Sequence, residues 1–234
     1  MSEALATPAQ NANTLPVNTE NLVAKSFDET AAAKFVTGID FLVRIQLCGS
    51  STNLCKEGKI AVGNYALIKN KNEFVDLGKS LNVWVCALRM KALAFGDDPV
   101  TVYYDPKTPE FQDIVRRAEA DKQNSGCMAG FEFLLYIPDK RTYATFFLSS
   151  ASARNEAPSL KALITKTATL SSALAENKKK QKWHVPKALT CSVPLAPPDM
   201  EEFASVTSRF VNAMPSSVKK ADAAKVGVDA DRPQ

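Results

Sequence analysis

The chain has 234 residues, of which 45% are hydrophobic and 23% are charged, a composition typical of a globular protein with a sizeable core. No apolar run approaches the roughly 20 residues that a membrane-spanning helix needs. Residues 1–20 also lack the basic start and the apolar block of a signal peptide. We therefore expect a cytoplasmic protein that makes no contact with a membrane.

Positive charge is concentrated in one part of the chain, although the net charge is only +4. Residues 139–191 hold ten Lys or Arg and three Asp or Glu, a local charge of +7, whereas residues 1–40 hold two and five. Such an excess of positive charge indicates an anionic partner for that segment. The plainer interpretation, a solvated basic surface without a partner, stays open.

Residues that carry catalytic or metal-binding chemistry are sparse. The single histidine, His184, lies beside lysines and has no nearby acid to orient it as a catalytic base. The sequence holds neither the paired cysteine spacing of a zinc site nor a glycine-rich phosphate loop. The five cysteines are odd in number, which favours reduced, buried thiols over a disulfide framework. We expect a protein that is not an enzyme and that binds no cofactor and no metal.

Local patterns predict a loose start and a β-rich first half. Residues 1–22 have no apolar periodicity and are predicted to be disordered, while the capping-box spacing of Ser26 and Glu29 predicts a short helix over residues 26–36. Apolar runs and alternation predict strands over residues 41–47, 59–69, 82–90 and 99–104. A helix is predicted to begin after Thr108, because this capping hydroxyl precedes a proline and an acid.

The second half begins with a predicted hairpin, whose strands cover residues 129–137 and 142–149 around a four-residue turn. Residues 158–177 are predicted to form the longest helix, because five large apolar residues follow helical spacing. These residues are Leu160, Leu163, Ile164, Leu170 and Leu174. A strand over residues 188–193 and an amphipathic helix over residues 199–213 follow, separated by prolines.

This order of elements predicts a β-rich α+β fold. About six strands with one inserted helix do not alternate as a doubly wound parallel sheet requires. A small Greek-key barrel of the OB-fold type, with inserted and appended helices, fits the order best. The predicted main domain covers residues 23–193. Residues 194–214 are predicted to form a linker and a C-terminal helix, and residues 215–234 are predicted to form a disordered tail.

The remaining functional signal is aromatic residues interleaved with positive charge. Proteins that bind single strands use exposed rings on which bases stack and Lys or Arg that neutralise phosphates. Trp183 is the strongest candidate, because its neighbours are polar or charged, although it is also explained as a clamp between the long helix and the barrel. Trp84, with apolar neighbours, is predicted to lie in the core. The other candidates are Lys178, Lys179, Lys180, Lys182, Arg89, Lys91, Tyr136, Tyr143, Lys140, Arg141 and Arg154.

In layout the chain resembles phage-encoded single-stranded DNA-binding proteins of the OB-fold type. The resemblance rests on the strand over residues 41–48, Gly63-Asn64-Tyr65, Leu77-Gly78, the turn Tyr104-Asp105-Pro106, the aromatic hairpin over residues 131–148 and the link over residues 153–158. It implies DNA binding in phage replication or recombination, in the host cytoplasm. Such proteins often end in a strongly acidic tail, whereas residues 226–234 hold two acids and one arginine.

Two hypotheses follow from the sequence. The first is a non-catalytic protein that coats single-stranded DNA through aromatic stacking and phosphate neutralisation. The alternative is a virion or other assembly protein, whose loose ends reach neighbouring subunits and whose C-terminal helix takes part in self-association.

Overall fold

The computed structural model describes residues 13–15, 17, 22, 42–70, 72–97, 100–121, 124–213 and 215–218. The strands are β1 Val43–Leu47, β2 Tyr65–Ile68, β3 Phe74–Gly78, β4 Ser80–Ala94, β5 Val100–Tyr103, β6 Cys127–Ile137, β7 Thr142–Leu148, β8 Thr167–Glu176, β9 Lys182–Thr190 and β10 Ser216–Val218. The helices are α2 Asn53–Lys56, α3 Pro109–Ala120, the 3-10 turn η2 Pro138–Lys140, α4 Ala151–Arg154, α5 Ala157–Lys161 and α6 Met200–Val211. The helix predicted over residues 26–36 lies outside the described residues.

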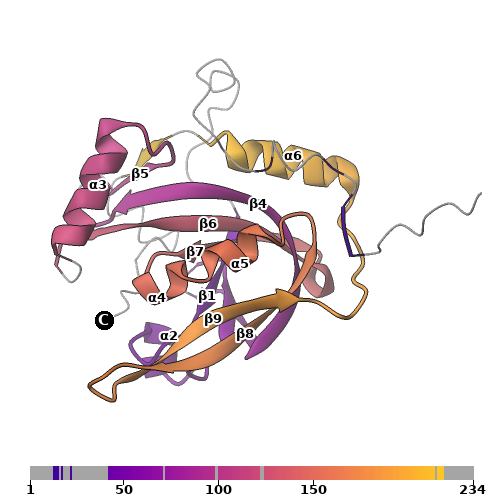
Figure 1. The fold of residues 1–234 in the computed structure, drawn as a ribbon, viewed down its shortest axis with the longest axis horizontal. Coiled ribbons are helices and arrows are strands. Elements are labelled where there is room, and N and C mark those ends of the chain that lie inside the picture. The colour runs from indigo at the N-terminus through magenta and orange to yellow at the C-terminus, as the bar shows by residue number, and fades with distance from the viewer. Residues whose placement is uncertain are drawn as a thin grey trace, which may run out of the picture.

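All ten described strands belong to one mixed sheet. Its long strands β4 and β6 run side by side across the protein (Figure 1). Its order is β10-β5-β4-β6-β7-β1-β2-β3, and the β8–β9 hairpin branches from the first half of β4. β1 is parallel to β7 and antiparallel to β2. Helix α6 lies along one side of the long strands, and α3 packs on β6 and β4.

The predicted β-rich α+β class is confirmed, but the predicted barrel is not, because the sheet is not closed. β3 pairs only with β2, and β9 pairs only with β8, so both remain edges within the described sheet. The curl of the sheet still brings β2 toward β8, where the Tyr65 hydroxyl donates to the backbone oxygen of Ser171 at 2.8 Å. β2 and β8 each already pair with two neighbouring strands, so this contact does not close the sheet.

The core forms around β4, which is buried on both faces. β6 pairs along one edge of β4, while β8 and β5 share its other edge. Trp84 is almost fully buried, as predicted, and its indole N–H donates to the backbone oxygen of Ala196 at 3.0 Å. All five cysteines are free thiols, and Cys55 alone is not fully buried. Burial raises the pKa of the Cys86 thiol, which keeps it protonated and unreactive.

The helices predicted after Thr108 and over residues 199–213 are confirmed, and each begins at a capping side chain. α3 begins after Thr108, whose hydroxyl accepts from the backbone N–H of Phe111 at 3.3 Å. α6 begins after Asp199, whose carboxylate accepts from the backbone N–H of Glu202 at 2.9 Å. Among the described residues no helix is long and apolar enough to cross a membrane.

The long helix predicted over residues 158–177 is wrong. The chain forms only the short α5 there, turns at Thr165 with a φ of 67°, and continues as β8. Thr165 donates its backbone N–H to Val85 at 2.7 Å, so the turn is fixed by the core strand β4. Leu170 then lies in the core, whereas Leu174 is largely exposed. Pairing of β8 with β4 outweighs the helical spacing of the leucines.

Two predicted strands have different limits in the structure. β2 begins only at Tyr65, because Gly63 adopts a φ of 87° in the loop that precedes it. β9 begins at Lys182 rather than at residue 188, and Thr190 ends it. The basic segment at residues 178–182 consequently belongs to a β-hairpin and does not follow a helix.

The predicted disorder of residues 215–234 is wrong at residues 216–218, which form β10 and pair with β5. The predicted disorder of residues 1–22 is also wrong at the positions that the structure describes. Leu15 and Leu22 are buried in the main core. The backbone N–H of Leu15 donates to Thr165 at 2.7 Å, and the backbone N–H of Thr167 donates to Asn13 at 3.2 Å. This part of the chain therefore covers the junction between α5 and β8.

Deletion of residues 1–22 is expected to lower the melting temperature. Burial of each of the two leucines stabilises the fold by about 1.5–3 kcal/mol. The chain entropy regained on deletion offsets part of this, and we expect a net loss of about 2 kcal/mol, or roughly 4–8 °C for a chain of this size. Deletion of residues 1–11 is the control, because it keeps Asn13 and Leu15. Equal melting temperatures for the two truncated proteins, measured by circular dichroism, would contradict the packing of these leucines.

Candidate nucleic-acid interface

The β8–β9 hairpin carries the most basic stretch of the chain at its turn, residues 177–181. The Asn177 side chain organises this turn. Its carbonyl oxygen accepts from the backbone N–H groups of Lys179 and Gln181 at 2.9 and 3.0 Å, and its amide donates to the Gln181 side chain at 2.7 Å. Lys180 takes a left-handed φ of 60°. The turn thus has a defined shape that displays its lysines.

Four lysines gather at this turn, which projects from the body of the protein at the lower left of Figure 1. Lys178, Lys179 and Lys180 are exposed within the turn. Lys182, at the start of β9, pairs with Glu176 at 3.6 Å, and both side chains are about half exposed. One carboxylate therefore opposes four ammonium groups, and the turn keeps a strong positive charge that attracts anions.

Trp183 is the second residue of β9, comes directly after Lys182 and is 37% exposed. Its indole N–H donates to the hydroxyl of Ser152 on α4 at 3.2 Å. Its partner across the hairpin is Ala175, whose side chain is too small to cover an indole ring. The ring therefore contacts α4 at its polar edge, and the residue as a whole keeps more than a third of its surface exposed.

His184 anchors the base of the hairpin. Its Nδ1 lies 2.7 Å from the hydroxyl of Ser172, and its ring lies directly over Gly63 in the loop before β2. A Cβ at Gly63 would come within 2.5 Å of the ring, so only glycine fits there. The hairpin is thus held against the body of the sheet.

The outer edge of β9 is closed to further strand pairing. The buried Glu156 accepts from the backbone N–H of Ala188 at 2.9 Å and from the ammonium of Lys187 at 3.1 Å. Pro186, two residues earlier on the same edge, has no N–H to donate. Charged side chains and prolines are common protections of edge strands, which makes β9 a poor template for strand addition.

Two of the predicted DNA contacts are instead part of the core. Arg89 is 1% exposed, and its guanidinium donates to Glu132 at 2.6 Å. It is sandwiched between the rings of Tyr104 and Phe210, 3.9 and 4.1 Å from their centroids. Lys91 binds the other oxygen of Glu132 at 2.6 Å and is largely covered. The prediction for Arg89 is wrong, because its buried guanidinium is out of reach of a phosphate, and Lys91 shares the Glu132 carboxylate with Arg89.

Tyr136 and Tyr143 are also wrong as stacking platforms. They are 8% and 5% exposed, and their rings pack against each other with centroids 5.0 Å apart. Burial raises the pKa of the Tyr143 hydroxyl well above its usual range. The cross-strand pair serves the packing of β6 on β7.

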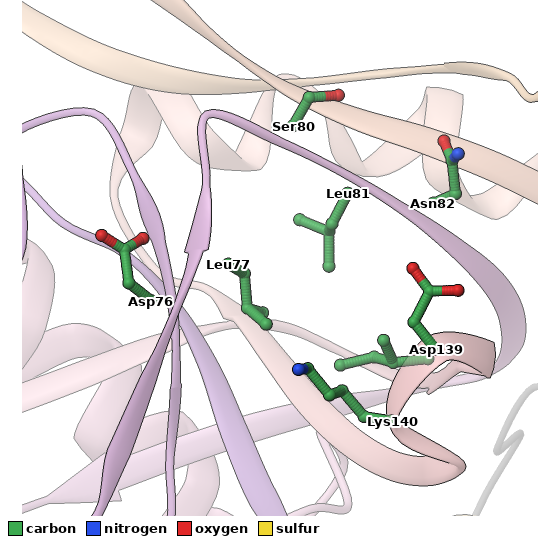
Figure 2. A pocket seen from close by; sticks show the side chains of 8 residues that line it. Asp76, Leu77, Ser80, Leu81, Asn82, Asp139 and Lys140 are labelled. Carbon is green, nitrogen blue, oxygen red and sulfur yellow. The ribbon is translucent and has the colours of Figure 1, made fainter.

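The other predicted cations are exposed or partly exposed but are not all gathered in one place. Lys140 and Arg141 lie at the β6–β7 turn, beside a hollow of about 290 Å³ between this turn and the β3–β4 corner. In Figure 2, Leu77, Leu81 and Lys140 point into the hollow, whereas Asp76 points away from it. Arg154 ends α4, the helix that contacts Trp183, and is half-buried.

Sequence reasoning missed Asn177, Ser152 and Glu156. The sequence did contain a signal for Asn177, because asparagine is a common turn residue and a run of charged residues follows it. Ser152 and Glu156 have no such signal, because their partners lie 31 or more residues away along the chain. Within the described part of the chain, no group of three or more His, Cys, Asp or Glu side chains is placed to hold a metal ion.

Comparison with family models, with curated proteins and with solved structures finds no match for this chain. The interpretation of its function therefore rests on the residues and their geometry.

Proposed function

We propose that this protein binds single-stranded DNA without catalysis and that the β8–β9 hairpin is its main contact. The observation that carries the proposal is the arrangement of four lysines around one shaped turn, directly followed by a partly exposed tryptophan. The two components of sequence-independent strand binding, phosphate neutralisation and base stacking, would then come from adjacent residues.

Each component has a physical role. Lysines that approach phosphates release condensed counterions, which gives affinity that depends strongly on salt. An indole ring stacks on any base, so it adds affinity without sequence preference. Arg154 on α4 adds positive charge to the element that holds Trp183, and Lys140 with Arg141 forms a second exposed basic turn between β6 and β7. A protein of this kind would coat exposed strands, as in phage DNA replication or recombination.

The direct test is a fluorescence anisotropy titration with labelled oligo(dT), compared with a duplex and with oligo(U) of equal length. We expect saturable binding to oligo(dT), weaker binding to the duplex, and loss of affinity with rising salt. Equal affinity for duplex and single strand would contradict the stacking role of Trp183, and no binding at low salt would overturn the proposal.

Replacement of Trp183 by Ala is expected to weaken oligo(dT) binding by about 1–3 kcal/mol, the value of one stacked base. The salt dependence should stay unchanged, because no charge is removed. Trp183→Phe is the matched control, since it keeps an aromatic face, and it should lose less. If Trp183→Ala instead lowers the melting temperature and its binding loss follows unfolding, Trp183 is a structural clamp.

A second candidate function is an assembly component that associates with itself. It is favoured by exposed apolar residues on and after the hairpin, of which Leu189 is 65% and Val193 is 54% exposed. Light scattering of the DNA-free protein tests it. Assembly would be favoured over strand binding if the protein forms a concentration-dependent oligomer that the Leu189→Ser substitution dissociates and if it has no affinity for oligo(dT).

A further inference from the structure

The orientation of the Trp183 ring is set by a residue outside the hairpin, Ser152 on α4. Its indole N–H donates to the Ser152 hydroxyl at 3.2 Å, and this is the polar contact that ties the ring to α4. Trp183 lies on an edge strand, where its partner Ala175 gives little side-chain packing. Without the serine, the indole N–H would lose this hydrogen bond, and only packing against the covered part of the residue would hold the ring.

Ser152 is itself held in register with β9. The hydroxyl of Ser150 caps α4 by accepting from the backbone N–H of Ala153 at 3.2 Å. Four residues after Ser152, Glu156 binds Lys187, which lies four residues after Trp183. Both pairs are separated by 31 residues, so the segment from α4 to α5 runs beside β9 in the same direction. The position of Ser152 relative to β9 is therefore fixed.

We propose that Ser152 is a positioning residue that holds the indole ring of Trp183 ready for a base. This inference rests on the proposed strand binding. Ordering a free side chain on binding costs affinity, and a side chain that is ordered beforehand avoids this cost. Ser152 consequently contributes to affinity without touching DNA.

The test is Ser152→Ala, measured in two ways. Oligo(dT) affinity is expected to fall about two- to tenfold, the range for one immobilised side chain, with an unchanged salt slope. In the free protein, the indole N–H resonance of Trp183, assigned by its absence from Trp183→Ala, is expected to shift and to lose order on the picosecond–nanosecond timescale. Ser152→Thr keeps the hydroxyl and should restore both values. Ser159→Ala, at an exposed serine of α5, is the matched control.

The outcomes separate the two proposals. A parent protein that does not bind oligo(dT) overturns the proposed function and, with it, the positioning role. A parent that binds, together with a Ser152→Ala variant that binds equally well, overturns the positioning role alone. An unchanged indole resonance in Ser152→Ala also overturns it, because the hydrogen bond would then not restrain the ring.

Discussion

Replacement of Glu132 by Ala is expected to lower the free energy of unfolding by about 3–5 kcal/mol. Glu132 is fully buried between Arg89 and Lys91, and its two oxygens accept from both cations at 2.6 Å. Without the carboxylate, the buried guanidinium of Arg89 loses the opposite charge that Glu132 supplies, which costs far more than the loss of one hydrogen bond. Urea unfolding should show a lower midpoint with an unchanged slope.

The matched control is Glu73→Ala, which also removes one carboxylate from a pair with a lysine. The Lys69–Glu73 pair lies at the surface, where both side chains are more than half exposed, so the expected loss is below about 1 kcal/mol. Glu132→Gln keeps the volume and an acceptor and should fall between the two. If Glu132→Ala costs no more than Glu73→Ala, the buried cluster does not support the fold.

This cluster also explains why Arg89 was misread from the sequence. Arg89 and Glu132 are cross-strand partners in the pairing of β4 with β6, 43 residues apart along the chain. The Arg89 guanidinium also donates to the backbone oxygen of Phe210 at 2.9 Å and so fastens the end of α6 to the sheet. A single sequence does not show strand register or the place of α6, so a buried arginine and a DNA-binding arginine look the same.

Elements with local signals were predictable. The cap at Thr108 lies within four residues of sequence, and α3 begins where this cap places it. α6 begins where its predicted amphipathic pattern starts. The hairpin of β6 and β7 was equally clear, because two apolar runs stand on either side of a short polar turn. Local chemistry therefore fixes where these elements start and how they turn.

Elements decided by distant contacts were not predictable. The leucines from Leu160 to Leu174 satisfy helical spacing, yet β8 is a strand because β4 offers it an unpaired edge. Alternating threonines at residues 165, 167 and 169 were the local hint, since β-branched residues favour strands. The basic segment at residues 178–182 kept its candidate role but changed its context, from a helix end to a hairpin turn with a defined shape.

Replacement of Lys178, Lys179, Lys180 and Lys182 by Gln is expected to flatten the salt dependence of oligo(dT) binding by roughly one to three units of slope. Each phosphate neutralised on a single strand contributes about 0.7 to this slope, and four exposed lysines therefore set the upper limit. The control replaces Lys56, Lys59, Lys69 and Lys107, four exposed lysines on other elements, and removes the same formal charge. Affinity is measured by anisotropy over a series of salt concentrations.

A hairpin variant with the parent's slope places the strand elsewhere on the protein. Equal flattening in both variants means that the general positive field, and not the hairpin, holds the strand. A flattened slope in the hairpin variant alone, beside a Trp183→Ala variant that is weaker at constant slope, assigns phosphates to the lysines and a base to the indole.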